Sequence, residues 1–458
     1  MTPAAITLTV FLVALALFIA DFLPMGLMVF MVPIALYFCG VIEAKEIFAP
    51  LVGQSIILVV AMSVIGAALF RTGMAERIGR LLFRFCPGER SLMLTVTLFS
   101  GFVSAFVSNT GTVAILIPII MGAAASHRIR PSRLLIPLTA GATLGGNISV
   151  IGSPGNLIAK ETIEKFSDGA MGIRFFEYAG VGIPLLIAAA VFYALVGPKL
   201  LPAKGADDCV PGRDGSTSRP SCGRAVGASL PAGGRAVGAS LPAGGGAVDA
   251  SLPAWKGWFT VIVLLVTVGA MIGADYFKCL PPMHISACVG AIAVVLFRVL
   301  TQKEAFAAFD MQAVFLLSFM TPLGGAMMKT GAAQQIADAV VNVGGGHGPL
   351  IMMAVLWLTV WGLTQVMSNT ATCALFCPIG WTIAKTLGAD PRAVVIAILI
   401  ASSVAVCTPL AIPANAMILE PGGLRFKDFF RPGICLSVLA FVLSMILLPI
   451  LYPFYPAP

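Results

Sequence analysis

The sequence predicts an all-α polytopic membrane protein built from two inverted repeats. Three observations predict this fold class. The 458 residues are 59% hydrophobic and only 10% charged, with a mean hydropathy of +0.99, which is typical of helical membrane proteins. Apolar segments lie in two series, one on each side of a polar linker. Motifs of the first series recur in the second at a nearly constant offset, which indicates an internal duplication.

The duplication rests on motif pairs that span more than 100 residues of each half. Lys45-Glu46 matches Lys303-Glu304 at an offset of 258, and Arg71-Thr72-Gly73 matches Lys329-Thr330-Gly331 at the same offset. Ser108-Asn109-Thr110 matches Ser368-Asn369-Thr370 at 260, and Asn156 matches Asn415 at 259. Offsets this regular are hard to obtain by chance.

The first repeat is expected at residues 1–202. Its apolar segments lie near 5–20, 25–43, 52–70, 91–106, 111–126, 134–159 and 178–198. The first of these lacks both the basic n-region and the small-residue cleavage site of a signal peptide, so we expect a retained helix. The segments at 91–106 and 111–126 are shorter than the roughly 20 residues that a spanning helix needs, so they predict a re-entrant hairpin at 91–126.

Residues 203–254 form a linker of different composition. The stretch 224–231 recurs almost unchanged at 235–242 and again at 247–253 with a period of 11, and every 11-residue period contains Gly and Pro. Such units cannot bury a core. We therefore expect a disordered, low-complexity cytoplasmic linker without chemistry of its own.

The second repeat is expected at residues 255–458. Its apolar segments lie near 257–274, 283–298, 310–328, 349–366, 371–386, 393–419 and 433–453. By the same length argument, 349–386 is predicted to be the second re-entrant hairpin. The segments at 134–159 and 393–419, which follow the two hairpins, are predicted to be broken helices.

The number of crossings predicts the orientation of the repeats. Each half has five crossing segments plus a hairpin, so the second copy enters from the opposite side and the repeats are inverted. Placing both termini outside puts 20 of the 28 Lys and Arg residues inside, and 13 against 8 remain inside when the linker is left out. This agrees with the positive-inside rule for a multi-pass protein of the plasma (inner) membrane.

Several function classes fit the sequence poorly. The net charge of +8 follows from the positive-inside bias. We therefore expect contact with membrane lipid and no binding of nucleic acid. Ten Cys without a CxxC pair and three scattered His leave no framework for a metal centre, an organic cofactor or a nucleophile. We expect no enzyme and no catalytic residue. A receptor or scaffold without transport remains an alternative, although it would need no broken spans.

The Ser-Asn-Thr motifs stand at the tips of the two hairpins. They place hydroxyls, an amide and unpaired backbone at membrane depth, which is tolerated only inside protein or beside a water-filled cavity. Ser104 and Thr364 lie one helical turn before the tips, on the same face as Ser108 and Ser368. Two such tips predict one shared polar site. The alternatives are hydroxyls bonded to their own helices and polar groups that only satisfy one another.

The broken helices contain Gly and Pro at residues 145–156 and 405–415. An unwound stretch offers carbonyl oxygens to a cation and a helix N-terminus to an anion. The alternative is that Pro and Gly only kink these helices. Tips and breaks contain no Asp or Glu, so a bound cation would be monovalent, and Na⁺ fits neutral oxygen ligands. They contain no Lys or Arg either, so co-bound cations and helix dipoles would have to compensate an anion.

With these motifs the chain resembles the divalent anion:sodium symporter family, which includes sodium-coupled dicarboxylate, citrate and sulfate carriers. The resemblance covers almost the whole chain outside the linker. It implies Na⁺ as coupling ion, a homodimer, and an elevator-type movement of the hairpin-bearing domain. The implied substrate is a small divalent anion, a dicarboxylate such as succinate or malate before sulfate or citrate. A sodium-independent exchanger or a proton-coupled carrier on the same scaffold is the alternative.

The resemblance also implies a set of site residues. One sodium site would comprise Ser104, Ser108, Asn109 and the Gly152 carbonyl, and the other Thr364, Ser368, Asn369 and the Ala411 carbonyl. The substrate would be lined by Asn109, Thr110, Ser153, Asn369, Thr370 and Pro413. The chain departs from the family pattern at Gly155, where a second proline is usual, and at Ile412, where dicarboxylate carriers tend to have Thr.

Overall fold

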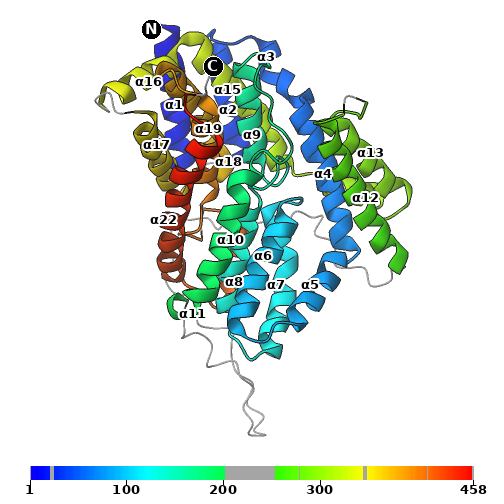
Figure 1. The fold of residues 1–458 in the computed structure, drawn as a ribbon. Helices are drawn as coiled ribbons and strands as arrows, with labels where there is room; N and C mark the ends of the chain where they lie inside the picture. The colour runs from blue at the N-terminus through cyan, green and yellow to red at the C-terminus, as the bar shows by residue number, and fades with distance from the viewer. Residues whose placement is uncertain are drawn as a thin grey trace.

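The computed structural model describes residues 2–20, 25–201, 253–277, 279–343, 348–409 and 411–455, and every regular element among them is helical. This agrees with the all-α prediction. The predicted linker at 203–254 lies outside the described residues except for its last two, where helix α12 begins at Ala254. The marks for the two chain ends both lie in the upper part of Figure 1.

The helices of the first half follow one another in the order of the predicted segments, with short helices between them. They are α1 (Pro3–Ala20), α2 (Met25–Phe38), α3 (Ala44–Phe48), the 3-10 helix η1 (Ala49–Val52), α4 (Gln54–Arg71), α5 (Met74–Arg84), α6 (Glu89–Ser104), α7 (Asn109–Ser126), α8 (Ser132–Gly145), α9 (Pro154–Phe166), α10 (Ala179–Leu195) and α11 (Gly197–Leu200).

The second half repeats this order. Its helices are α12 (Ala254–Ala274), α13 (Met283–Leu296), α14 (Gln302–Ala307), α15 (Met311–Thr330), α16 (Ala332–Val343), α17 (Pro349–Thr364), α18 (Asn369–Thr386), α19 (Pro391–Ser403), α20 (Pro413–Met417), α21 (Leu419–Gly422) and α22 (Phe426–Leu451).

Among the described residues, six helical stretches are long and apolar enough to cross a membrane. They are Pro3–Ala20, Ala44–Arg71, Asn109–Ser126, Trp255–Ala274, Met311–Thr330 and Phe426–Leu451. One of them is α7, which the sequence predicts as half of a re-entrant hairpin. Length alone therefore does not separate a re-entrant from a crossing helix here, and the re-entrant hairpins stay a prediction.

The helix breaks fall where Pro stands after an unwound stretch. Helix α8 ends at Gly145 and α9 begins at Pro154, while α19 ends at Ser403 and α20 begins at Pro413. Proline suits the first position of a helix because its missing amide hydrogen would have no partner there. The breaks, called break 1 (146–153) and break 2 (404–412) below, thus lie at equivalent places in the two halves.

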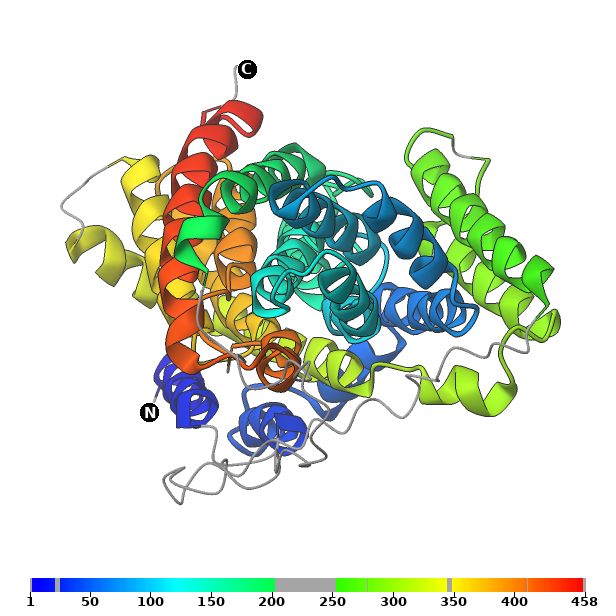
Figure 2. The same ribbon diagram turned by 90° about the horizontal axis from the view of Figure 1, so that it is seen from below.

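The centre of the molecule is formed by the helices that lead into the breaks. Nearly every residue of α8 and of α19 is buried, whereas α12, α13 and α22 expose many large apolar side chains. In both views α12 and α13 pack on α4, to one side of the other helices (Figures 1 and 2). Exposed apolar surface on the outer helices is expected where a protein faces lipid.

Helices α6 and α8 cross at very short distance because glycines line their contact. A Cβ on Gly145 would lie 2.2 Å from the Cα of Gly101, and a Cβ on Gly141 would lie 2.4 Å from the carbonyl oxygen of Thr97. Small residues allow such an approach between helices in membranes. The crossing brings the C-terminal ends of α6 and α8 together, and this is where the first candidate site lies.

Two ion pairs connect the halves reciprocally. Arg71 at the end of α4 pairs with Glu304 of α14, and Lys329 near the end of α15 pairs with Glu46 of α3. These are the residues of the duplicated motifs with offset 258. Each repeat therefore uses its copy of the basic residue to bind the other repeat's copy of the acidic one.

Candidate functional site

The two tips have the same local structure. Ser108 precedes α7 and its hydroxyl oxygen accepts a hydrogen bond from the Gly111 amide at 3.3 Å. Ser368 precedes α18 and accepts from the Ala371 amide at 3.2 Å. Each serine thus acts as a helix N-cap, which satisfies an amide that the helix itself leaves free. Asn109 and Asn369 are consequently the first residues of helices α7 and α18.

The two breaks are held open by equivalent asparagines. The side-chain amide of Asn156 donates to the carbonyl oxygens of Gly146 and Ser149, at 2.7 and 2.5 Å. That of Asn415 donates to the equivalent carbonyls of Ala405 and Thr408, at 2.9 and 3.0 Å. Because both donor hydrogens face the unwound backbone, each asparagine fixes the shape of its break.

Each break is also bonded to the tip of its own hairpin. The Ser149 hydroxyl donates to the Ala105 carbonyl, and the Thr408 hydroxyl donates to the Gln365 carbonyl at 2.7 Å. Ala105 and Gln365 occupy equivalent positions, directly after the last residue of α6 and of α17. Tip and break therefore form one unit in each half.

The first cluster of oxygens lies where α6, α7 and break 1 meet. The buried Ser104 hydroxyl lies 2.7 Å from Oδ1 of Asn109. Oδ1 of Asn109 and the Gly152 carbonyl oxygen lie 2.5 and 3.3 Å from the point where a Cβ on Gly146 would stand. Three predicted ligands of the first sodium site therefore converge beside Gly146. The fourth, Ser108, is exposed and its hydroxyl caps α7.

The second cluster lies where α17, α18 and α19 meet. The buried Thr364 hydroxyl lies 2.9 Å from Oδ1 of Asn369 and 2.7 Å from the Ser402 carbonyl oxygen. Thr364 and Asn369, two predicted ligands of the second sodium site, are thus brought together. The Ser402 carbonyl, which was not predicted from the sequence, lies beside them. Ala411 is buried in break 2, and Ser368 is half-buried at its cap position.

The residues predicted to line the substrate lie at helix N-termini. Thr110 and Thr370 are the second residues of α7 and α18, and both are half-buried. Ser153 is buried and immediately precedes α9, while Pro413 is the exposed first residue of α20. This places all four beside the positive ends of helix dipoles.

The two half-sites contact each other directly in the interior of the molecule. The Cys373 thiol in the first turns of α18 lies 3.4 Å from the Gly155 carbonyl at the start of α9. The Ser403 hydroxyl at the end of α19 donates to Oδ1 of Asn147 in break 1 at 2.8 Å. Helix α20 packs on α7 in the same way as α9 packs on α18. Both tips and both breaks thus meet around one central region.

The electrostatics of this region separate cation and anion. Oxygen clusters lie at the C-terminal ends of α6, α8, α17 and α19, whose carbonyls carry partial negative charge. The N-terminal ends of α7, α9 and α18 carry partial positive charge and point to the same region. The tips and breaks themselves contain no charged side chain.

The oxygen clusters fit a small cation as cargo. The Thr364 hydroxyl has one hydrogen but two oxygen acceptors within 2.9 Å, so one oxygen keeps a free lone pair. Within the described part of the chain, the buried Oδ1 atoms of Asn156 and Asn415 have no hydrogen-bond partner either. Neutral oxygens without donors suit Na⁺, whereas a divalent ion prefers carboxylates.

The family model described as citrate transporter matches residues 13–278 and 278–457, which together cover nearly the whole chain. The chain belongs to the citrate transporter family. This family placement makes the chain a multi-pass membrane transporter and not an enzyme, in agreement with the resemblance to anion symporters and with the apolar helices. The sequence interpretation of the class is thereby confirmed.

Relatives of this citrate transporter family member agree with the placement. The transporter YfbS of Escherichia coli K12 is 22% identical, and the match covers 98% of this chain and 99% of the relative. The sodium-dependent low-affinity dicarboxylate transporter 1 of Caenorhabditis elegans is 30% identical over 30% of this chain and 24% of its own length. The YdaH transporter structure from Alcanivorax borkumensis has a TM-score of 0.57 at 13% identity and covers 99% of this chain and all of its own, which shows a shared fold.

Sequence reasoning about this transporter missed three polar residues of the central region. Gln365 bonds to break 2, Asn147 joins break 1 to α19, and Asn156 holds break 1 open. Asn156 was part of the motif that carries the family resemblance and of the duplication, but no bonding role was predicted for it. Their partners are backbone groups or residues far away in sequence, so no local pattern gives them a role.

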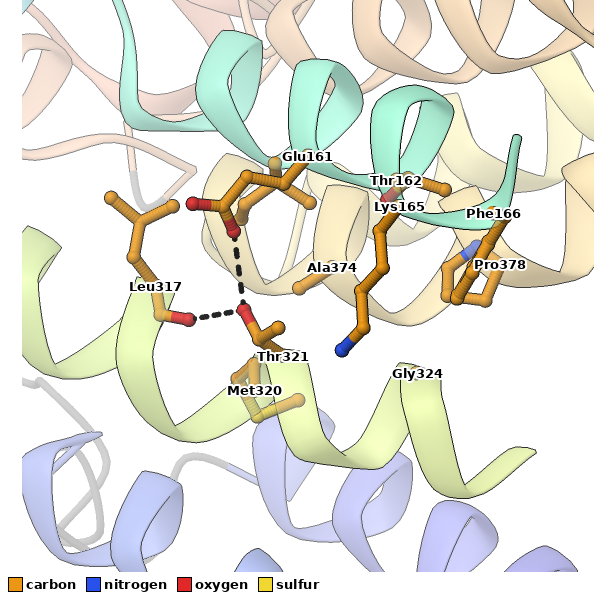
Figure 3. Close-up of a pocket in the computed structure, with 11 residues that line it drawn as sticks. Glu161, Thr162, Lys165, Phe166, Leu317, Met320, Thr321, Gly324, Ala374 and Pro378 are labelled. Atoms are coloured by element: carbon orange, nitrogen blue, oxygen red, sulfur yellow. Dashed lines mark hydrogen bonds between the residues drawn. The ribbon is translucent and has the colours of Figure 1, made fainter. Parts of the chain in front are cut away.

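The transporter also has a small pocket outside the tips, between α9, α15 and α18 (Figure 3). The Thr321 hydroxyl lies 3.4 Å from a carboxylate oxygen of Glu161, and the Lys165 amine lies on the other side of the pocket (Figure 3). Gly324 faces Pro378 across it, with no room for a Cβ. The pocket thus contains one carboxyl group, that of Glu161 on α9.

Proposed function

We propose that this transporter carries a small divalent anion together with Na⁺ by secondary active symport. The observation that carries the proposal is the pair of equivalent oxygen clusters, Ser104 with Asn109 and Thr364 with Asn369, in a region without charged side chains. Cations bound in both clusters supply the positive charge that the protein does not. A dianion is then held by co-bound cations and by the N-terminal ends of α7, α9 and α18.

Obligate coupling follows from this arrangement. A doubly charged anion at membrane depth costs much free energy unless its charge is compensated. Without cations the site offers a dianion only the partial charges of the helix ends, which do not compensate two full charges, so the anion binds after Na⁺. Each ion must then raise the affinity for the other by the same factor, because binding free energies are linked. We expect a dicarboxylate such as succinate or malate as substrate, before sulfate or citrate. The name of the C. elegans relative supports a dicarboxylate, and the description of the family model supports citrate.

The proposed transport cycle is an elevator movement of the part that contains the tips and breaks. The equivalence of the two half-sites supports two inverted repeats, and Figure 1 draws α6–α8 in the lower and α16–α19 in the upper part of the molecule. We also propose that both termini lie outside, that the linker is cytoplasmic, and that the chain is a homodimer in the inner membrane. The homodimer rests on the family resemblance, and the mass of the purified protein in detergent tests it.

Uptake into proteoliposomes tests the symport. Labelled succinate should accumulate against its gradient only when an inward Na⁺ gradient is present, and unlabelled dicarboxylates should compete better than sulfate, citrate or phosphate. Collapse of the Na⁺ gradient with an ionophore should abolish accumulation. Equal accumulation in Na⁺-free buffer would overturn the symport proposal.

A proton-coupled carrier is the second candidate, and Glu161 is the observation that favours it. Its carboxyl group lies in the pocket beside Thr321, on the helix that begins at break 1. Protonation of a carboxyl at that place would change a contact between α9 and α15. A pH gradient should then drive uptake without Na⁺, and Glu161→Gln should abolish that uptake. Sodium-driven uptake that is insensitive to Glu161→Gln would reject this candidate.

A further inference from the structure

The second hairpin is bonded to its break much more strongly than the first. Nε2 of Gln365 donates to the Val404 carbonyl at 3.0 Å, and the Cys407 amide donates to Oε1 of Gln365 at 3.1 Å. The bond from the Thr408 hydroxyl to the Gln365 carbonyl is the equivalent of the Ser149–Ala105 bond, and the Thr364 hydroxyl in addition joins α17 to the Ser402 carbonyl of α19. The Gln365 side chain thus bonds to both a carbonyl and an amide of the unwound backbone of break 2.

The equivalent position in the first repeat is Ala105, which has no side chain that could do the same. The tip of the first hairpin, residues 105–110, is called tip 1 below. Among the described residues, the bond from the Ser149 hydroxyl to the Ala105 carbonyl is the one hydrogen bond between tip 1 and break 1. Break 1 is held from other sides. The Val150 amide donates to the Phe175 carbonyl, and Asn147 accepts from Ser403. The first tip is therefore held to its break by fewer side-chain hydrogen bonds than the second tip is.

We infer that Gln365 is a positioning residue that preorganises the second cation site and makes the two sites unequal. The inference rests on the proposed sodium symport. Before any cation binds, the amide of Gln365 already fixes Val404 and Cys407 relative to Thr364 and Asn369. A cation entering there orders little backbone, whereas a cation at the first site must also order a tip that fewer hydrogen bonds hold to its break. The second site therefore fills first, and closure of tip 1 completes the site.

The chemistry of the Gln side chain is needed for this role. A leucine has a similar volume but would leave the Val404 carbonyl and the Cys407 amide, both on buried residues, without their partner. An ionised glutamate could accept from Cys407 but has no hydrogen to donate to Val404. Only a side chain with one donor and one acceptor end satisfies both groups.

The inference is tested by measuring how uptake into proteoliposomes depends on the Na⁺ concentration in the variant Gln365→Leu. We expect the Na⁺ concentration for half-maximal uptake to rise about tenfold, with the maximal rate recovered at saturating Na⁺, because two hydrogen bonds that preorganise the site are lost. A misfolded variant would lose its maximal rate instead. Gln334→Leu is the matched control. Gln334 is an exposed residue of α16 whose side chain, within the described residues, bonds Asp338 of α16 and Thr386 at the far end of α18 from the tip, so this change should leave the Na⁺ dependence unchanged.

Hydrogen exchange of the full-length protein gives an independent readout. In Na⁺-free buffer, break 1 should exchange faster than break 2, and Na⁺ should protect break 1 most. In Gln365→Leu, exchange at break 2 should rise to the rate of break 1. Equal exchange of the two breaks in the unaltered protein, or an unchanged Na⁺ dependence in Gln365→Leu, would overturn the inference. Sodium-independent uptake by the unaltered protein would instead overturn the proposed function, and the exchange experiment would still decide whether the two breaks differ.

Discussion

Asn156 and Asn415 stand 259 residues apart and bind the unwound backbone in the same way. Each donates from Nδ2 to two carbonyl oxygens, which lie ten and seven residues before it. Both side chains are almost completely buried, and Oδ1 of each has no partner within the described residues. The duplicated sequence thus produces two equivalent breaks, each with an acceptor oxygen that faces no donor.

The first prediction concerns these asparagines. Asn156→Ala and Asn415→Ala should each lower the free energy of unfolding by about 1–3 kcal/mol, because two buried carbonyls lose their donor. Thermal unfolding in detergent measures this, and uptake should fall in both variants. Asn156→Asp should also be destabilising, since a carboxylate cannot donate and a protonated carboxyl group has one hydrogen for two carbonyls. Unchanged unfolding of all three would contradict the role of these bonds.

The second prediction concerns the space beside Gly146. A Cβ there would stand 2.5 Å from Oδ1 of Asn109, so Gly146→Ala should displace a ligand of the first cation site. We expect Na⁺ affinity in uptake assays to drop about tenfold or more, which corresponds to the loss of one cation ligand. Gly122→Ala on α7 is the control, because nothing lies within 4 Å of a Cβ there. Comparable losses in both variants would argue against a site at Gly146.

The third prediction concerns the capping serines. Ser108→Ala or Ser368→Ala should weaken Na⁺ affinity and substrate affinity together, because the two bound species are linked. Loss of the cap also costs about 1 kcal/mol of helix stability at the tip. Titrations of uptake with Na⁺ at several substrate concentrations separate the two affinities. A variant that lost only one of them would count against a shared site.

The fourth prediction concerns the reciprocal ion pairs. Arg71→Glu should place two acidic side chains together and lower the melting temperature, while the double exchange Arg71→Glu with Glu304→Arg should restore it. The effect should stay below about 1 kcal/mol because Glu304 is partly exposed, and it should shrink at high salt. A double variant no more stable than the single one would mean that the two residues do not interact.

Much of the helical framework was predictable because the apolar runs and the duplicated motifs are long-range patterns in one dimension. The pair Pro154 and Pro413 marked where the second parts of the broken helices begin, and Ser108 and Ser368 marked the starts of α7 and α18. Helices α5 and α16 were not predicted. They are short and follow Gly73 and Gly331, whose positive φ angles turn the chain out of α4 and α15.

Ser108 illustrates a limit of spacing arguments. Its position four residues after Ser104 places both on one helix face, yet α6 ends at Ser104 and the chain turns before Ser108. The hydroxyl consequently caps α7 while that of Ser104 lies beside Asn109. Helix periodicity predicts neighbours only as far as the helix continues.

The amino-acid sequence by itself determined that this protein is helical, membrane-embedded and duplicated, and that its polar residues gather at two tips and two breaks. These properties follow from composition and from order along the chain. Only the tertiary structure decided that Gln365 bonds across to Val404 and Cys407, that Ser403 reaches Asn147 of the other repeat, and that Arg71 pairs with Glu304. Those bonds join backbone groups and side chains 39 to 256 residues apart, and such partners meet only after the helices have packed.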